Sequence, residues 1–153
     1  MNNGSNIKAL IILHKALLLG QIIFAAVSFF LVYSKALVSS NEELDRALQV
    51  AAIILSAGGF FAGTSLFKKK LLQIRGMQAD AKEKLSVYRS ACIIQWALIE
   101  GPCLFTIISF FVTGNYAFIA LAAVLILLFT MMAPSKAKIA FHLGLSEAEV
   151  EEL

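Results

Sequence analysis

The sequence has little charge and few of the residues from which catalytic and metal sites are usually built. Only 15% of the 153 residues are charged, and the chain has two histidines, two cysteines and two prolines. No group of cysteines and histidines has the spacing of metal ligands, and no phosphate-binding loop, nucleophile elbow or zinc-protease motif is present. We therefore predict a protein that is not an enzyme and that holds no metal and no cofactor.

The two cysteines, Cys92 and Cys103, fall in the same apolar segment. On one straight helix their separation of eleven residues places them about 16 Å apart, which is too far for a disulfide. We expect both to pack as small apolar side chains.

Long apolar runs dominate the sequence instead. Hydrophobic residues make up 59% of the chain and the mean hydropathy is +0.82, whereas a soluble domain is about 45–50% apolar. Crossing a bilayer takes a helix of roughly 20 residues. Helices are expected at about 8–33, 42–75, 80–112 and 116–133, followed by a cytoplasmic tail at 134–153. The predicted fold is all-α: one integral membrane domain, residues 1–153, built as a four-helix bundle.

Polar connections indicate where some helices should begin and end. Ser40 and Glu43 form a capping box, which predicts that the second helix starts just after Ser40. Gly76 predicts a turn within the basic segment that follows this helix. After Pro134 we expect an amphipathic stretch at the membrane interface, and then a second capping box at Ser146–Glu149.

Basic residues are distributed unevenly among the connections, and this predicts the topology. Eleven lysines and arginines lie in the N-terminal part, the loop at residues 68–90 and the C-terminal tail, whereas the other two connections hold only Lys35 and Arg46. Positively charged loops stay in the cytoplasm, so we predict that both termini are cytoplasmic, in the cytoplasmic (inner) membrane of a bacterium. The basic loop then indicates topology and attraction to the lipid bilayer, not nucleic-acid binding.

Small residues and an internal similarity predict how the helices pack. Gly59 and Gly63 form a GxxxG pair, which lets another helix approach closely. Residues 20–30 resemble residues 101–111, with glycine, phenylalanine and Ser-Phe-Phe in the same places. This similarity fits a duplicated two-helix unit, or a coincidence between membrane segments that use few residue types.

One acid, Glu100, interrupts the third apolar run and is the main candidate for a functional residue. It is the only acid within the predicted membrane parts of the helices, at about residues 8–33, 47–67, 91–112 and 116–133, and it lies near the middle of the third. A charge at that depth is costly and usually functional. Because desolvation disfavours the carboxylate, Glu100 can be neutral at pH 7 and can load and release a proton, or ionise when a cation arrives. Gly101 is expected to open space beside the carboxylate, and Pro102, which removes a backbone donor, to loosen the helix. Both residues are also predicted to take part in helix packing.

Polar residues in the first apolar run need a separate interpretation. Gln21 falls near the depth of Glu100, and it is predicted either to share an ion-binding site with Glu100 or to make a hydrogen bond between helices. His14 and Lys15 lie about one turn inside the start of the segment. We expect His14 at the membrane interface, with Lys15 reaching back to that interface along its stem.

The stretch from Tyr88 to Phe105 resembles the carboxylate-bearing helix of the c subunit, or proteolipid, of rotary ATP synthases. The likeness rests on Arg89-Ser90, Ala97-Leu98-Ile99-Glu100 and Pro102, and with the small-residue helix and basic loop before them it covers about residues 50–113. The resemblance implies that Glu100 is an ion-binding carboxylate. The chain differs from that family in its glycine pattern, in lacking the Arg-Gln-Pro loop signature, and in having two more helices.

These observations lead to one function and two alternatives. We predict a small proteolipid-like membrane subunit that binds or carries H+ or Na+ through Glu100, in a homo-oligomer or in a hetero-complex with other membrane proteins. The first alternative is a non-catalytic accessory or scaffold subunit in which Glu100 is structural. The second is a small exporter of cationic compounds, because small multidrug exporters also have four helices and one membrane glutamate.

Overall fold

The computed structural model describes residues 4–34, 42–146 and 149, and it is all-helical in these ranges. Three long helices, α1 (Gly4–Tyr33), α2 (Glu42–Gly76) and α3 (Ala81–Thr113), are followed by the shorter α4 (Tyr116–Met131) and α5 (Lys136–Leu143). The all-α prediction is confirmed, and the long helices match their predicted ranges to within a few residues. The predicted capping residue Ser40 lies outside the described residues.

Turn and capping residues set the ends of α2 and α3. α2 ends at Gly76, as predicted, and residues 77–80 turn the chain back. The Asp80 carboxylate then accepts a hydrogen bond from the Glu83 backbone N–H at 2.8 Å and begins α3. Gly114 ends α3 with a φ of 68°, the left-handed conformation that glycine adopts without strain. Both helices are longer than the roughly 20 residues that a helix needs to cross a bilayer.

The fourth apolar segment forms a shorter helix than the sequence predicts. α4 ends at Met131 instead of residue 133, and its 16 residues extend about 24 Å, less than the roughly 30 Å of the hydrocarbon core. Pro134 explains the early end, because the residue before a proline avoids the helical conformation. α5 follows at 70° to α4. Three described helices are therefore long and apolar enough to cross a membrane, or four if α4 and α5 form one bent span.

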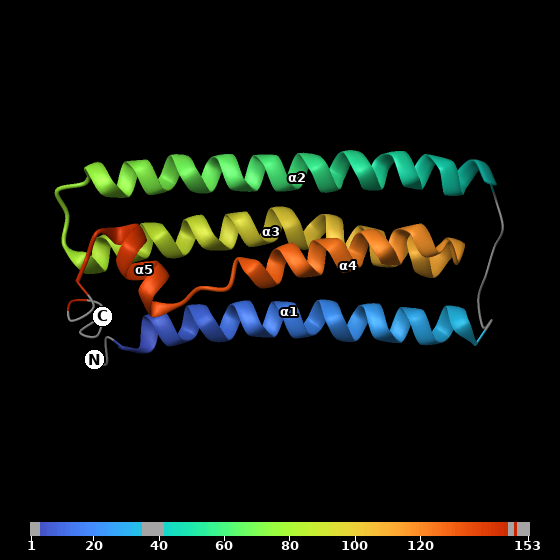
Figure 1. The fold of residues 1–153 in the computed structure, drawn as a ribbon, viewed down its shortest axis with the longest axis horizontal. Coiled ribbons are helices and arrows are strands. Elements are labelled where there is room, and N and C mark those ends of the chain that lie inside the picture. The colour runs from blue at the N-terminus through green and yellow to red at the C-terminus, as the bar shows by residue number, and fades with distance from the viewer. Residues whose placement is uncertain (1–3, 35–41, 147–148, 150–153) are drawn as a thin grey trace.

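The helices run alternately up and down, and α3 is the central one (Figure 1). It packs against α2 on one side and against α1 and α4 on the other. Half of the most apolar 18-residue stretch of α3 is buried within the protein, compared with 17% in α1 and in α2. The outer faces of α1 and α2 remain apolar, and Phe30 and Phe61 are each 68% exposed. Faces of this kind suit contact with lipid.

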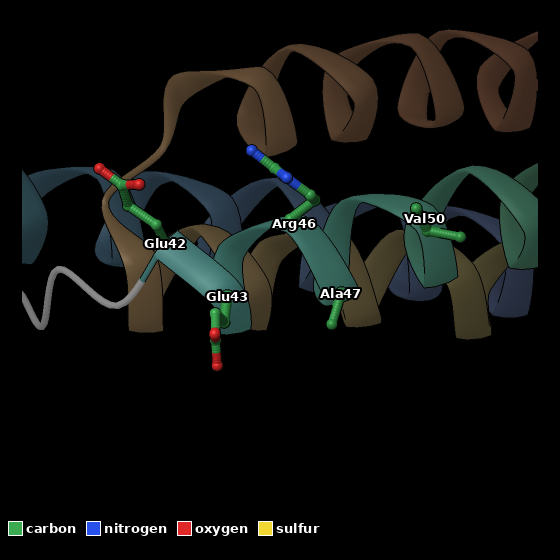
Figure 2. Close-up of a pocket in the computed structure, with 5 residues that line it drawn as sticks. All are labelled: Glu42, Glu43, Arg46, Ala47 and Val50. Atoms are coloured by element: carbon green, nitrogen blue, oxygen red, sulfur yellow. The ribbon is translucent and has the colours of Figure 1, made fainter.

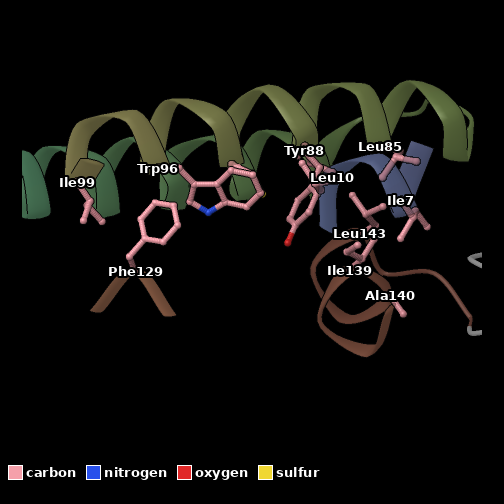
Figure 3. Packing of buried hydrophobic residues seen from close by; sticks show 12 residues of the cluster. Ile7, Leu10, Leu85, Tyr88, Trp96, Ile99, Phe129, Ile139, Ala140 and Leu143 are labelled. Carbon is pink, nitrogen blue, oxygen red and sulfur yellow. The ribbon is translucent and has the colours of Figure 1, made fainter. Parts of the chain in front are cut away.

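Buried apolar side chains form three clusters along the bundle. The largest joins the start of α1, α3 and α5 at the end where α2 turns into α3 (Figure 3). A second cluster, around Val32, Phe110 and Phe118, lies at the opposite end, and a third, around Cys103 and Ile107, joins α3 to α4. The start of α1, the α2–α3 turn and α5 thus share one end of the bundle (Figure 1). The side of the membrane that this basic end faces stays a prediction.

α5 is the predicted amphipathic stretch, and it docks on the basic end of the bundle. The Tyr88 hydroxyl on α3 lies 3.2 Å from Nδ1 of His142 on α5. Lys138 Nζ donates hydrogen bonds to the carbonyls of Met131 and Ala133, each at 3.1 Å. These bonds satisfy carbonyls that the end of α4 would otherwise leave free.

We expect the docking of α5 to weaken as the pH falls. Burial lowers the pKa of His142 from its ordinary 6.5, and the positive charges of Arg75 on α2 and Lys138 on α5 lower it further. A histidine whose pKa is lowered by docking stabilises the docked state fully above pH 6.5, and this stabilisation is lost as the pH falls through the lower pKa. Hydrogen exchange of the α5 amides, corrected for intrinsic rates, should be several-fold faster at about pH 5.5 than at about pH 7.5. The variant His142→Gln should remove this difference, and an unchanged difference in the variant would contradict the prediction.

Candidate functional site

Glu100 lies near the middle of α3, on the side that faces away from α2. Leu98 and Pro102 lie against α2, and a residue two positions from each is on roughly the opposite side of the helix, because each residue turns it by about 100°. Glu100 is partly buried. Within the described part of the chain, no hydrogen bond or ion pair reaches its carboxyl group. The carboxyl therefore lies at the border between the interior of the bundle and its outer surface.

Two ring contacts set the register between α1 and α3. The ring of His14 lies 4.9 Å from that of Trp96, and the ring of Phe29 lies 6.2 Å from that of Phe110. In these pairs the α3 residue follows the α1 residue by 82 and 81 positions. The two helices run in the same direction (Figure 1), so an offset of 81–82 describes their alignment between the two contacts. The same offset of 81 relates the two similar segments in the sequence.

Gln21 lies inside the bundle at nearly the level of Glu100. The register places Gln21 opposite residues 102–103 of α3, which are two or three residues, or about 3–5 Å along the axis, from Glu100. The Gln21 side chain is only 1% exposed, and neither of its amide atoms has a hydrogen-bond partner among the described residues. The two residues thus share a depth, but they make no direct hydrogen bond. Buried polar groups are nearly always bonded, so the Gln21 amide needs an explanation.

Cys103 completes the polar groups at this level. It lies one turn after Glu100 on α3, it is fully buried, and its Sγ is 3.9 Å from the Ala122 carbonyl on α4. Cys103 and Cys92 are both free thiols, as predicted from their spacing. The Cys103 side chain fills the contact between α3 and α4, in keeping with the expected apolar packing role.

The closest approach of α2 to α3 occurs at Gly59. The position that a Cβ atom on Gly59 would take is filled by the Leu98 carbonyl oxygen, and Pro102 Cγ lies 3.0 Å away. At Gly63, one turn on, a Cβ atom would be 3.4 Å from the Gln95 carbonyl oxygen. Because Pro102 has no N–H, the Leu98 carbonyl lacks its usual helical donor. The Gly59 backbone lies beside this carbonyl, where a Cα–H contact is favourable.

Gly101 makes no close contact with another helix among the described residues, so its predicted packing role stays a prediction. A Cβ atom on Gly101 would meet nothing within 4 Å, and the residue is exposed. Gly101 instead leaves open the outer surface of α3 directly after Glu100, which agrees with the expectation of space beside the carboxylate.

His14 is a core residue, which corrects the expected position at the membrane interface. It is 1% exposed, and its Nε2 donates to the Phe129 carbonyl on α4 at 3.0 Å. Its ring stacks on that of Phe129 with 4.6 Å between centroids and meets the edge of Trp96. The spacing of polar residues could have predicted this burial, because His14, Gln21 and Ser28 recur every seven residues and all three are buried.

A hollow lies beside the first turns of α2, away from Glu100 (Figure 2). It measures about 630 Å³ and is lined by Glu42, Glu43, Arg46, Ala47 and Val50. In Figure 2 the Glu42 and Arg46 side chains lie on one side of the helix and Glu43 points to the other. The hollow is at the end of α2 remote from the α2–α3 turn, and Glu100 does not line it. We therefore assign the candidate site to the middle of the bundle, at Glu100 and Gln21.

The chemistry of this site has to be inferred from its own residues. Among the described residues, no three His, Cys, Asp or Glu side chains gather as a protein metal site would require. No family model, curated protein or solved structure matches this chain.

Proposed function

We propose that the chain is a small membrane subunit that binds or carries H+ or Na+ through Glu100, with Gln21 at the same site. The observation that supports it most is the unbonded amide of Gln21, whose two polar atoms are buried within about one helical turn of the depth of an intramembrane acid. Leaving such atoms unbonded costs free energy. A proton on Glu100, or a cation held by it, would supply the missing interaction.

Glu100 and Gln21 offer complementary chemistry for a proton carrier. A protonated carboxyl has one O–H donor, which suits the carbonyl oxygen of Gln21, whereas the ionised carboxylate only accepts, which suits the amide N–H groups. Rotation of the amide would let Gln21 bond either form of Glu100. Both states of a cycle that loads and releases a proton would then be bonded. For Na+, the carboxylate and the amide oxygen would supply two of the oxygen ligands.

The partial exposure of Glu100 indicates how the ion would reach it. The carboxyl lies at the edge of the bundle, and Gly101 leaves the adjacent surface open. A second copy of the chain or another membrane protein could cover this edge and provide the path for the ion. The proposal therefore places the subunit in a homo-oligomer or hetero-complex, in the cytoplasmic membrane of a bacterium.

Carbodiimide labelling of the purified protein tests this proposal. The reagent modifies protonated carboxyl groups in apolar surroundings, so Glu100 should be labelled rapidly at neutral pH. Labelling should slow as the pH rises and the carboxyl ionises, and added Na+ should also slow it if sodium is the ion. Glu100→Gln should abolish the labelling. The matched control Glu83→Gln removes an exposed acid from the same helix and should leave it unchanged.

A Gln21→Leu variant tests whether the two residues share the site. Loss of one hydrogen bond, worth about 1 kcal/mol, should change the labelling rate of Glu100 or its pH dependence about fivefold. If neither the labelling rate nor its pH dependence changes, the site consists of Glu100 without Gln21. If Glu100 stays unlabelled in the folded protein but reacts after unfolding, the ion-carrier proposal is wrong, and the accessory-scaffold function, with a structural carboxyl, replaces it.

A further inference from the structure

A second site lies between α2 and α3, nearer the basic end of the bundle than Glu100. It is a groove of about 190 Å³ lined by Leu66, Lys69, Lys70 and Gln73 of α2 and by Ala91 and Ile94 of α3. Two of its lining residues are lysines and none is acidic, while its walls are mostly apolar. This combination suits a ligand with an anionic group and a hydrocarbon part, and it does not involve Glu100.

The two halves of the groove lie at different depths. The uncharged stretch of α2, residues 47–67, is centred on Ala57, and Lys69 lies 12 residues, or about 18 Å, beyond that centre. Half of the hydrocarbon core is about 15 Å, so Lys69 lies at the level of the lipid headgroups. Leu66 lies about 13 Å from the centre, on the hydrocarbon side of the boundary. The groove therefore crosses the level at which a phospholipid changes from headgroup to acyl chain.

The lysines have hydrogen-bond donors available for a phosphate. Lys69 and Lys70 are neighbours on an exposed turn of α2, and Lys70 Nζ donates to the Gln73 side-chain oxygen at 3.3 Å. Each ammonium group has three donors, so the bond to Gln73 leaves Lys70 donors for a further acceptor. On the hydrocarbon side, Ile94 is 44% exposed and Leu66 45% exposed, which offers apolar surface to an acyl chain.

We propose that this groove binds one anionic phospholipid. The lipid phosphate lies between Lys69 and Lys70, and one acyl chain runs along Leu66, Ala91 and Ile94. The volume of the groove is below that of pockets that enclose a whole small ligand, so the lipid lies partly in the groove and partly in the surrounding bilayer. A nucleic acid or an acidic protein segment would have no use for the half of the groove that lies at hydrocarbon depth.

Native mass spectrometry of the full chain in detergent tests the proposal. The protein is mixed with phosphatidylglycerol or with phosphatidylcholine of the same acyl chains, and the retained lipid is counted. The wild-type protein should retain one phosphatidylglycerol in preference to phosphatidylcholine. An attraction worth about fivefold in affinity for each lysine predicts a loss of roughly 25-fold in Lys69→Gln/Lys70→Gln. The matched control Lys82→Gln/Lys84→Gln removes the same charge from α3, outside the groove, and should lose less than twofold.

A pair of uncharged variants tests the apolar half. Ile94→Trp fills the groove and should reduce phosphatidylglycerol retention, whereas Ile93→Trp alters a neighbouring exposed residue outside the groove and should not. Equal losses in the two lysine double variants would show general attraction to a basic loop and overturn the proposal. An equal effect of the two tryptophan variants on phosphatidylglycerol retention would also overturn it. The six substituted positions are exposed or half-buried, so circular dichroism should show intact helices in all four variants.

Discussion

Gly59→Ala should lower the free energy of unfolding by about 1–3 kcal/mol, the usual cost of overpacking. The new methyl group would take the position of the Leu98 carbonyl oxygen and press on Pro102. Neither group yields easily, because one is helix backbone and the other is a ring closed onto the backbone. The two helices would have to separate at their closest contact. Because α3 is the central helix, this separation would affect the packing of the whole bundle.

The neighbouring glycine provides a matched control for this prediction. A Cβ atom on Gly58 would meet nothing within 4 Å, so Gly58→Ala should be neutral or should stabilise the helix by up to about 1 kcal/mol, the propensity gain of alanine over glycine. Unfolding of both variants by a denaturing detergent, followed by helical circular dichroism, would compare them. Equal stability of the two variants would show that α2 and α3 do not meet at Gly59.

Phe129→Ala should lower the free energy of unfolding by about 3–5 kcal/mol, as expected for removing a buried aromatic ring. Phe129 is fully buried, its ring stacks on that of His14, and its centroid lies 6.4 Å from that of Trp96. Helix association within a membrane depends on close packing, because lipid is as apolar as the protein interior. The cavity would therefore weaken the contact among α1, α3 and α4 without a compensating gain.

The control for this variant removes the same side chain from the outer surface. Phe61 is 68% exposed on α2, so Phe61→Ala should change the unfolding free energy by less than about 0.5 kcal/mol. The chain contains one tryptophan, Trp96, and its fluorescence reports directly on the ring cluster during unfolding. If Phe129→Ala costs no more than Phe61→Ala, the cluster of His14, Trp96 and Phe129 is not part of the stable core.

The lengths and turns of the helices could be predicted because local signals determine them. The second helix was expected over residues 42–75 and α2 spans Glu42–Gly76, since the glycine and the basic turn follow the apolar stretch directly. The capping box at Ser146 and Glu149 also forms, with the backbone N–H of each residue bonded to the side chain of the other. Pro134 predicts the end of α4 at residue 133, but the helix ends two residues earlier, at Met131, because the residue before a proline also avoids the helical conformation.

Side-chain environments were harder to predict because they depend on which faces of the helices meet. His14 stands beside Lys15 near the start of an apolar run, and this position suggested the interface, although its seven-residue spacing from Gln21 places it on the buried face of α1. The depth of Gln21 followed from counting residues along parallel helices. Its missing bond to Glu100 did not follow, because a hydrogen bond also depends on the distance between helices and on side-chain rotation. The ion-binding roles of both residues stay predictions.

The short α4 makes the two routes to Glu100 unequal in length. The ring of Phe129 lies near that of Trp96, and Trp96 precedes Glu100 by four residues on α3. Because α4 runs antiparallel to α3 and ends at Met131, two residues after Phe129, it passes the level of Glu100 and ends about 9 Å beyond it, toward α5. In the other direction α3 continues for 13 residues, or about 20 Å. A bilayer matched to this bundle would be locally thin beside the end of α4. If Glu100 binds an ion as proposed, the thinner side would make the route toward α5 the shorter one, and loading from the far side would depend more strongly on the membrane voltage than release toward α5.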